Sequence, residues 1–309
     1  MNVFVTGGTG RLGRNLVQAL IQRGDQVTAL SRSSAGGQLG ASPVRGDLLD
    51  GASLRSAAAG AEQVFHLGGG VRGKGRHTPA VLNEEGTRNL VQALDGRAQK
   101  LVLASSAAVY GDRSNLWVEE DFEPSPNTRY GLSKVAAERL VLDSGQPWVI
   151  ARMAAVYGPD LPFAMVGRML EGKAWLPGEG RNHVPTIHTD DCIAGLIRVA
   201  DAGEVRGIYH LADRSQPTLR EFYAEVQRVV GGQPVRFWST YVPSYVQSFI
   251  ARNNERLASR IGQKPRLTPD TLKLFTNSVR LRTERLAQEL DFTWKYPEHP
   301  AGIEASFHR

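Results

Sequence analysis

The order of apolar segments predicts an α/β protein with a Rossmann-type, doubly wound parallel sheet and a smaller C-terminal substrate lobe. Over the first half of the chain, apolar runs typical of buried strands alternate in single file with helical patterns. A glycine-dense turn joins the first apolar run to the first helical pattern. In doubly wound sheets a ligand binds across the carboxyl ends of the strands, so we expect the chemically important side chains directly after strands.

The composition is that of a globular protein with a full core. The 309 residues suffice for one large α/β domain or a domain with a smaller lobe. The formal net charge of +6 comes from 37 basic and 31 acidic residues scattered along the chain, so we expect no nucleic-acid partner. Cys192 is the single cysteine, which excludes an intramolecular disulfide, and no metal site is predicted. We expect a cytoplasmic protein without an integral membrane segment, because the chain begins with a strand pattern and no apolar run approaches roughly 18 residues.

Residues 3–13, Val-Phe-Val-Thr-Gly-Gly-Thr-Gly-Arg-Leu-Gly, predict a strand, a turn and the start of a helix. Gly7 permits a tight turn, Gly10 lets the backbone approach a pyrophosphate, and Gly13 lets the helix lie close to the strand. The N–H groups at the helix start then favour phosphates. The spacing is Gly-x-x-Gly-x-x-Gly, so the commoner dinucleotide pattern fits only approximately, and an ordinary glycine-rich turn is the alternative.

A second strand is predicted over 26–31, and Arg32 follows at its carboxyl end. An acidic residue near this point would hold the ribose hydroxyls of NAD, whereas an arginine among small hydroxyl residues suits a 2′-phosphate. NADP is therefore favoured, with NAD possible, and an exposed loop arginine is the alternative. Arg11, in the glycine turn, adds a second positive group near the cofactor phosphates.

The chain from 33 to 105 continues the alternation. Residues 33–42 are rich in Ser, Gly and Ala and are expected to be a mobile loop. A short third strand is predicted over 44–47, where Asp47 either caps a turn or accepts from the adenine amino group. Three elements follow in order: a strand over 63–67, a helix over 78–94 and a strand over 100–105.

The loop between the strand at 63–67 and the next helix holds several basic residues among glycines: Arg72, Lys74, Arg76 and His77. This loop is either a solvated connection or a mobile clamp over an anionic part of substrate or cofactor.

A helical pattern within 124–141 carries Tyr130 and Lys134, four residues apart and therefore on one helix face. A phenol with a pKa near 10 is a poor acid–base catalyst at neutral pH, but a nearby ammonium and a positively charged nicotinamide ring favour the phenolate. Tyr130 can then exchange a proton near physiological pH. A serine hydroxyl at the end of the 100–105 strand, where Ser105 and Ser106 lie, would complete a site for a substrate oxygen. Such a Tyr–Lys pair alone is common on helices without catalytic meaning.

The last third of the chain adds elements that we place in the substrate lobe or against the sheet. A helix to about 202 is expected to be capped by Thr189 or Asp190, with His188 and Cys192 structural. Thr218 with Glu221 resembles a capping box. The expected elements are a strand over 207–212, a helix that starts at this capping box and runs to Val230, and a closing helix over 283–290.

The stretch 237–261 is amphipathic, with aromatic residues on one side and arginines on the other. The aromatic residues are Trp238, Tyr241, Tyr245 and Phe249, and the arginines are Arg252, Arg256 and Arg260. Three interpretations stay open: a helix packed inside the substrate lobe, a lid over an apolar substrate, and a helix that lies on a membrane surface.

Taken together, these motifs resemble the extended short-chain dehydrogenase/reductase family, which contains nucleotide-sugar epimerases, dehydratases and many ketone reductases. The segments that carry the resemblance follow the family's order over about the first 215 residues: Thr6–Gly13, Asp47-Leu48, Val64–Leu67, Asn83 with Gly86–Asn89, Ser105–Gly111, Tyr130–Lys134, Val156–Pro159 and Ile187–Asp191. Jointly they are highly specific.

The resemblance implies a Ser–Tyr–Lys site in an NAD(P)-dependent enzyme. Ser106 and Tyr130 would hold a carbonyl oxygen, Tyr130 would act as acid/base, and Lys134 would hold the nicotinamide ribose and lower the tyrosine pKa. Asn83 would support the site or contact the cofactor. The implied cofactor-binding residues are Thr6, Gly7, Gly10, Arg11, Leu12, Gly13, Arg32, Asp47, Leu48, Leu67, Asn83, Tyr130 and Lys134.

The resemblance also implies a homodimer, and the absence of a visible repeat or long linker predicts how the chain is divided. Residues 1–159 with about 184–215 would form the dinucleotide-binding domain, and about 160–183 with 216–309 the substrate lobe. Three positions depart from the sugar-modifying branch: Ala155 replaces an asparagine, Val184 replaces a phosphate-binding arginine, and position 108 is alanine.

We therefore expect an NADP-dependent oxidoreductase that transfers a hydride between nicotinamide and a carbonyl or secondary alcohol of a fairly apolar small molecule, nearer the reductase and hydroxysteroid-dehydrogenase-like branch. A nucleotide-sugar epimerase, dehydratase or reductase is the alternative. A non-catalytic NAD(P)-sensing protein is a further alternative, which the intact Ser106, Tyr130 and Lys134 disfavour.

Overall fold

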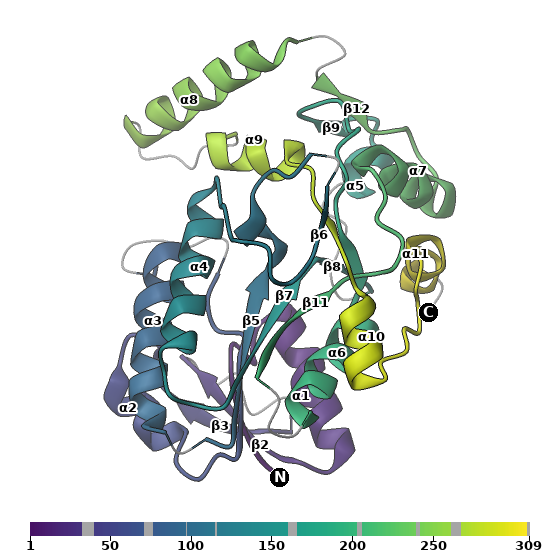
Figure 1. Cartoon of the computed structure of the whole chain (residues 1–309). Helices are drawn as coiled ribbons and strands as arrows, with labels where there is room; N and C mark the ends of the chain where they lie inside the picture. The colour runs from purple at the N-terminus through teal and green to yellow at the C-terminus, as the bar shows by residue number, and fades with distance from the viewer. Residues whose placement is uncertain are drawn as a thin grey trace.

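A seven-stranded parallel sheet forms the centre of the protein, with helices on both of its faces (Figure 1). The computed structural model describes residues 1–32, 40–70, 77–96, 98–114, 116–159, 166–202, 206–238, 242–260 and 267–307. The strand order is β11-β7-β5-β4-β1-β2-β3. The strands are β1 (Asn2–Thr6), β2 (Gln26–Ser31), β3 (Ser42–Arg45), β4 (Gln63–His66), β5 (Lys100–Ser106), β7 (Trp148–Met153) and β11 (Gly207–Leu211).

The chain reverses its direction of travel across the sheet between β1 and β4. After β1 it adds β2 and β3 on one side, and then it returns to place β4 and β5 on the other side. Such a switch point opens a crevice beyond the carboxyl ends of the two central strands. The carboxyl ends of β1, β4 and β5 are therefore where a ligand site is expected.

Alternating side chains of the strands build a separate core on each face of the sheet. Val3, Val5 and Val102 join the core under α1 (Arg11–Arg23) and α6 (Thr189–Asp201). Phe4, Leu101 and Leu103 belong to the opposite core. Three helices cover that second face: α2 (Gly51–Ala57), α3 (Pro79–Leu94) and α4 (Arg129–Leu142). The doubly wound architecture predicted from the sequence is confirmed.

Short parallel pairs tie distant parts of the chain to one another above the sheet. The pairs are β6 (Trp117–Val118) with β13 (Arg280–Leu281), β8 (Ala155–Tyr157) with β10 (Thr186–His188), and β9 (Trp175–Leu176) with β12 (Arg236–Phe237). The remaining helical elements are the 3-10 helix η2 (Ala107–Tyr110), α5 (Val166–Leu170), α7 (Leu219–Val230), α8 (Ser244–Arg260), α9 (Pro269–Thr276), α10 (Glu284–Leu290) and α11 (His299–Phe307). A third core of residues such as Met169, Phe222 and Ile303 lies among them.

Several local expectations need correction. The third strand is Ser42–Arg45 rather than 44–47. The cap of α6 is His188, whose Nδ1 accepts from the Asp190 N–H at 3.1 Å, so the assignment of the cap to Thr189 or Asp190 is wrong. The Thr189 hydroxyl instead donates to the Tyr157 carbonyl at 2.8 Å.

Two C-terminal expectations differ from the structure in extent. The helix α10 does not close the chain, because α11 follows it. The amphipathic stretch 237–261 is not one element, since Phe237 ends β12 and α8 covers Ser244–Arg260. The capping box of Thr218 and Glu221 at the start of α7 is confirmed.

The helix α8 lies at the end of the molecule beyond α9 and the N-terminus of α4 (Figure 1). Within the described residues, no helix combines the length and the apolar character that crossing a membrane requires.

Candidate active site

The glycine turn after β1 has the shape that a diphosphate needs. Gly7 has φ +75°, and a Cβ at this position would lie 2.7 Å from the Gly68 nitrogen. A Cβ on Gly13 would lie 2.1 Å from the Gly7 carbonyl oxygen, so glycine allows α1 to start directly against the turn. Gly10 is the N-cap of α1 and provides no side-chain cap, and the first turn of α1 holds no acidic residue. The first N–H groups of α1 thus suit an anion.

The two arginines expected near the cofactor are both exposed. Arg11 is the first residue of α1, and Arg32 directly follows β2, the neighbour of β1. Asp47 caps a turn, because its Oδ1 accepts from the Leu49 N–H at 3.0 Å. Its Oδ2 lies 2.8 Å from His77 Nε2. Of the basic loop, Arg72, Lys74 and Arg76 lie outside the described residues, so the clamp stays a hypothesis.

A buried chain of hydrogen bonds connects the turn after β1 with α3. The Gly68 N–H donates to Thr6 Oγ1 at 3.0 Å, and Thr6 Oγ1 lies 2.6 Å from His66 Nδ1. His66 Nε2 lies 2.9 Å from Thr87 Oγ1, which donates to the Asn83 carbonyl at 2.5 Å. Burial, with a smaller effect of the Lys134 charge, lowers the pKa of His66 to about 3.

The neutral state of His66 fixes every proton in this chain. The Thr87 hydroxyl proton is committed to the Asn83 carbonyl, so His66 Nε2–H must donate to Thr87 Oγ1. His66 Nδ1 is then an acceptor for the Thr6 hydroxyl. His66 belongs to the Val64–Leu67 segment, and no role for it was predicted from the sequence. The structure places it between the glycine turn and Asn83.

Asn83 holds two segments of the site together. Its Nδ2 donates to Ser133 Oγ at 2.8 Å and to the Gly70 carbonyl at 3.3 Å, while its Oδ1 accepts from the Gly70 N–H at 3.2 Å. Ser133 is adjacent to Lys134 on α4. The asparagine is buried, and these contacts fix the loop after β4 against α4.

Ser106 and Tyr130 meet where β5 ends and α4 begins. Ser106 is the N-cap of η2, and its Oγ accepts from the Ala108 N–H at 3.2 Å. A Cβ on Gly131 would lie 2.4 Å from the Ala108 carbonyl oxygen, so glycine lets α4 pack directly on η2. This close approach brings the half-buried Tyr130 phenol near the Ser106 hydroxyl.

The electrostatic state of Tyr130 differs from the expectation. Burial raises the pKa of Tyr130 above its usual value, and the nearby Ser106 hydroxyl offsets this only in part. Lys134 Nζ lies 6.0 Å from the centre of the Tyr130 ring. The chain alone therefore keeps the phenol protonated, and the expected lowering of its pKa by Lys134 is not found.

Lys134 is buried against the end of β5. Its Nζ donates to the Ala104 carbonyl at 2.8 Å. Burial lowers the pKa of Lys134 to about 8, although the Glu138 carboxylate acts in the opposite direction. The ammonium is thus close to its titration point at neutral pH.

A buried ion pair between Glu138 and Arg152 packs against the residues of the candidate site. The sequence did not predict this pair. Glu138 accepts two hydrogen bonds from Arg152, at 3.1 Å from Nε and 2.8 Å from Nη2. Ser105 Oγ also donates to Glu138. Arg152 Nη1 further donates to Tyr110 Oη at 2.7 Å. Two signals were present: a glutamate one turn after Lys134, and an arginine inside an apolar strand.

Helices α8 and α9 are attached to the residues just before Tyr130, a second arrangement that the sequence did not predict. Arg129 Nε donates to Asp270 Oδ2 at 2.8 Å and its Nη2 pairs with Glu255 on α8. The side-chain amides of Asn127 and Asn277 exchange hydrogen bonds of 3.1 and 2.8 Å. The C-terminal part of the chain therefore contacts helix α4 at its N-terminus.

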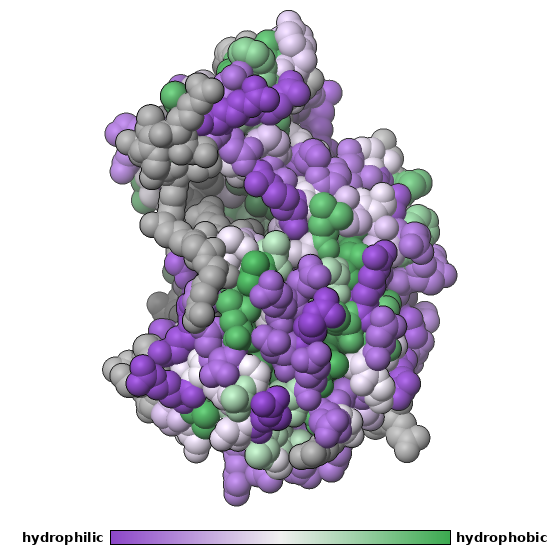
Figure 2. Space-filling view, turned by 90° about the vertical axis from the view of Figure 1, so that its left-hand side faces the viewer, coloured by the Kyte–Doolittle hydropathy of each residue, from purple (hydrophilic) through white to green (hydrophobic). Residues whose placement is uncertain are grey.

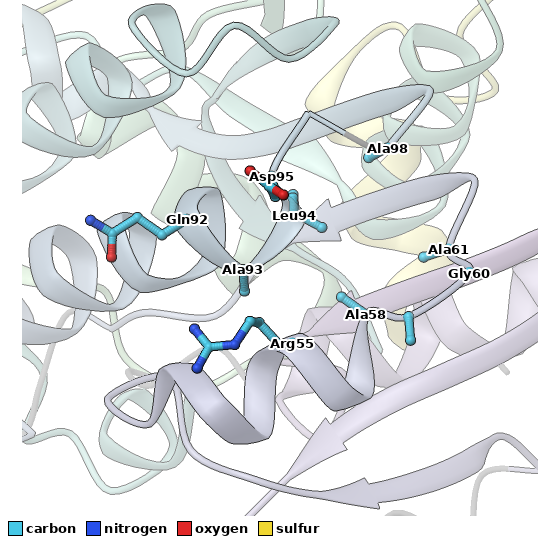
Figure 3. A pocket seen from close by; sticks show the side chains of 10 residues that line it. Arg55, Ala58, Gly60, Ala61, Gln92, Ala93, Leu94, Asp95 and Ala98 are labelled. Carbon is cyan, nitrogen blue, oxygen red and sulfur yellow. The ribbon is translucent and has the colours of Figure 1, made fainter.

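A surface cavity elsewhere on the sheet carries no candidate chemistry. Figure 3 shows this cavity of about 320 Å³ between the C-terminal ends of α2 and α3. It lies beside the amino ends of β4 and β5, opposite the edge that holds Ser106. Its charged lining residues are Arg55 and Asp95. We therefore do not assign it to the reaction.

Comparison with known proteins identifies a family and several relatives. Residues 3–212 match the NAD dependent epimerase/dehydratase family. The chain is 33% identical over 240 residues to 4-hydroxy-2-methyl-3-oxo-4-farnesyl-3,4-dihydroquinoline-1-oxide ketoreductase from Stigmatella aurantiaca. This match covers 72% of this chain and 71% of that protein. It is 33% identical to dTDP-4-dehydrorhamnose reductase from Streptomyces griseus, over 75% and 77% of the two chains. It is 30% identical to 2-alkyl-3-oxoalkanoate reductase from Stenotrophomonas maltophilia, over 76% and 77%.

Among solved structures, the fold is similar to that of MoeE5 in complex with UDP-glucose and NAD. The TM-score is 0.76 at 23% sequence identity, and the alignment covers 99% of this chain and 97% of that one. At this identity the similarity concerns the fold alone.

Proposed function

The chain belongs to the NAD dependent epimerase/dehydratase family, a group of NAD(P)-dependent short-chain dehydrogenase/reductase enzymes, and from this premise we propose that it is an NADP-dependent reductase of a ketone in an apolar small molecule. The reverse reaction is oxidation of the corresponding secondary alcohol. The observation that carries the proposal is the meeting of Ser106, Tyr130 and Lys134 at the carboxyl edge of the sheet.

The protonated state of Tyr130 suits the direction of reduction. Its raised pKa keeps the phenol proton available, and a carbonyl oxygen gains negative charge as its carbon is reduced. Tyr130 can donate its proton to that oxygen, while the Ser106 hydroxyl holds the same oxygen. The phenol then recovers a proton from solvent, so that one proton and one hydride are consumed for each alcohol formed.

The chain's own residues fit a phosphorylated dinucleotide. When bound, the cofactor supplies the hydride. The glycine turn and the uncapped start of α1 suit its diphosphate, and the Lys134 ammonium suits its ribose hydroxyls. Exposed guanidinium groups of Arg11 and Arg32 favour a 2′-phosphate, which supports NADP. We propose further cofactor contacts from Thr6, Gly7, Gly10, Leu12, Gly13, Asp47, Leu48, Leu67 and Asn83.

The apolar substrate class is supported by the names of two relatives and by three residues of this chain. One relative reduces a compound named for its farnesyl group and another a compound named as a 2-alkyl-3-oxoalkanoate. Ala108, Ala155 and Val184 occupy positions where the sugar-modifying branch places polar or charged groups. Val184 packs against the core around Phe222.

Cofactor titration followed by a carbonyl panel tests the proposal. We expect tighter binding of NADPH than of NADH in a fluorescence titration. We also expect NADPH oxidation, followed by absorbance, with long-chain β-keto esters and isoprenoid ketones and none with dTDP- or UDP-4-keto sugars. Preference for NADH, or turnover restricted to nucleotide sugars, would overturn it.

A nucleotide-sugar reductase or epimerase is the second candidate, because the chain is also similar to a dTDP-4-dehydrorhamnose reductase. This candidate requires a group that binds the nucleotide diphosphate, and Val184 cannot supply one. Purification of the protein with tightly retained NAD would favour it.

We also propose that two parts of the chain have different roles and that the protein forms a homodimer. Residues 1–159 with 184–215 bind the cofactor, and 160–183 with 216–309 supply the substrate lobe. Limited proteolysis with and without NADPH checks the division, and light scattering checks the oligomeric state.

A further inference from the structure

The helix α8 is amphipathic in the structure, with one face buried in the protein. Gln247, Ala251 and Ala258 lie at intervals of four and seven residues and are buried, at 1%, 0% and 7% exposure. Ala251 packs in a small core with Leu272 of α9. Gln247 Oε1 accepts from the Gly178 N–H at 3.1 Å. This face holds α8 on the protein.

The opposite face of α8 carries large apolar side chains without cover from the described residues. Tyr245, Phe249 and Leu257 follow one ridge of the helix at i, i+4 and i+12, and they are 73%, 63% and 59% exposed. Ile250, on the next ridge, is 40% exposed. Figure 2 shows hydrophobic and hydrophilic side chains together at the top of the molecule, at the height of α8. Four large apolar side chains on one outward face indicate a surface that binds something.

Basic side chains border this apolar ridge. Arg252 and Arg256 are both exposed and lie one turn apart on the adjacent ridge. The acidic side chain of α8, Glu255, faces the protein instead, where it pairs with Arg129. The outward face of α8 is therefore positive and apolar, on a chain with a formal net charge of +6.

We propose that α8 docks the protein on the surface of a membrane that contains anionic lipids. Phenyl, phenol and leucyl groups enter the boundary between headgroups and acyl chains, while flanking arginines pair with lipid phosphates. A second copy of the chain is a poorer occupant, because a two-fold interface centred on α8 would place the arginines of both copies in the same patch. The docking surface is defined by Tyr245, Phe249, Ile250, Leu257, Arg252 and Arg256.

The attachment of α8 to Arg129 places this surface near the candidate site. Arg129 precedes Tyr130 and pairs with both α8 and α9. Docking would hold the N-terminus of α4, and with it the candidate site, near the bilayer. The proposal itself stands on α8 and does not depend on the reaction, so the two fail separately.

Vesicle sedimentation tests the proposal with the full chain. Vesicles of phosphatidylcholine with added phosphatidylglycerol should pellet the protein, vesicles of phosphatidylcholine alone should pellet little, and high salt should release it. The pair Phe249→Gln and Leu257→Gln should lower the partition coefficient about tenfold or more, because both apolar groups are lost while glutamine keeps the helix propensity. Arg252→Gln with Arg256→Gln should lower it by a similar factor on anionic vesicles only.

Matched controls use exposed residues far from α8. Leu142→Gln and Arg139→Gln, on the C-terminal half of α4, should leave sedimentation unchanged. Melting temperatures of all variants verify folding. If the variant with Phe249→Gln and Leu257→Gln does not fold, the variant with Arg252→Gln and Arg256→Gln still tests the proposal. Failure of the parent protein to pellet with anionic vesicles overturns the proposal, as does equal binding by parent and both variant pairs. A dimer in light scattering that Phe249→Gln with Leu257→Gln converts to a monomer would assign this face to a second copy instead.

Discussion

At the scale of single residues, the site depends on how burial sets proton positions. Burial raises the pKa of Tyr130 and lowers the pKa of Lys134 to about 8, so both side chains are less charged than in water. Burial keeps His66 neutral, and its ring forms hydrogen bonds with both Thr6 and Thr87. The spacing of Tyr130 and Lys134 predicted that they share a helix face, but not this balance, because desolvation depends on the strands and loops packed around them.

The titration of Lys134 predicts a limit on activity at alkaline pH. If its ammonium holds the cofactor ribose, kcat/KM for NADPH is constant below a pH of about 8 and falls as the pH rises through that value. The fall should approach tenfold per pH unit, since the neutral amine lacks the charge and one donor. Initial rates of NADPH oxidation across this range provide the measurement. Lys134→Arg is the control, whose guanidinium stays protonated. A parent profile that stays flat well above this pH contradicts the prediction.

Arg32 predicts the cofactor preference. Loss of a charge-assisted hydrogen bond to the 2′-phosphate costs about 1.5–3 kcal/mol, which corresponds to a drop of about ten- to a hundredfold in kcat/KM for NADPH. We expect this drop for Arg32→Ser, with kcat/KM for NADH nearly unchanged. Arg88→Ser on α3 serves as an exposed control. Equal losses with both cofactors would assign Arg32 a structural role.

At the scale of elements, the periodicity of apolar residues predicted the strands and helices that long, contiguous sequence patterns determine. Strand β2 lies at the predicted 26–31, and helix α3 lies within the predicted 78–94. The two-residue pairs β6 with β13 and β9 with β12 were not predicted, since each depends on a partner more than fifty residues away. The His188 cap was missed because histidine rarely acts as an N-cap and depends here on its neighbours.

The buried pair of Glu138 and Arg152 predicts the stability of the elements beneath the site. Glu138→Gln leaves the Arg152 guanidinium buried without its counter-charge, so the free energy of unfolding should fall by about 3–5 kcal/mol. Urea unfolding followed by circular dichroism is the measurement. Combining Glu138→Gln with Arg152→Met should recover part of the loss. A single-variant cost below about 1 kcal/mol would show that the pair is not the support inferred here.

At the scale of the whole molecule, the C-terminal chain returns to the first turn of α6. Backbone N–H groups of Lys295 and Tyr296 donate to Asp191 at 2.7 and 2.8 Å. Asp213, at the end of β11, accepts from the His188 N–H and the Thr186 hydroxyl. These long-range contacts, like those of Arg129 with α8 and α9, follow from three-dimensional packing, and no local pattern in the sequence predicted them.

Asp213 predicts how stability depends on pH. Burial raises its pKa from 3.8 to about 8, so between these values the folded chain holds a proton that the unfolded chain has released. The contribution of this proton to the free energy of unfolding falls as the pH rises, by up to about 1.4 kcal/mol per pH unit. Asp213→Asn cannot lose that proton, so its unfolding free energy relative to the parent should increase from pH 5 to pH 8, on the order of a few kcal/mol. Urea unfolding at both pH values measures this difference. A constant difference would mean that Asp213 is ionised in the fold.

The most direct test of the central claim follows a labelled hydride. NADPH carrying deuterium at both C4 positions is mixed with an apolar ketone that the parent enzyme accepts, and the alcohol is examined by mass spectrometry. We predict one deuterium on the carbinol carbon and one oxidised cofactor for each alcohol. Tyr130→Phe should slow the reaction by about 10²–10⁴-fold while NADPH still binds. Alcohol formed without deuterium, or unchanged turnover by Tyr130→Phe, would contradict the assignment of Tyr130 as the proton donor in a carbonyl reductase.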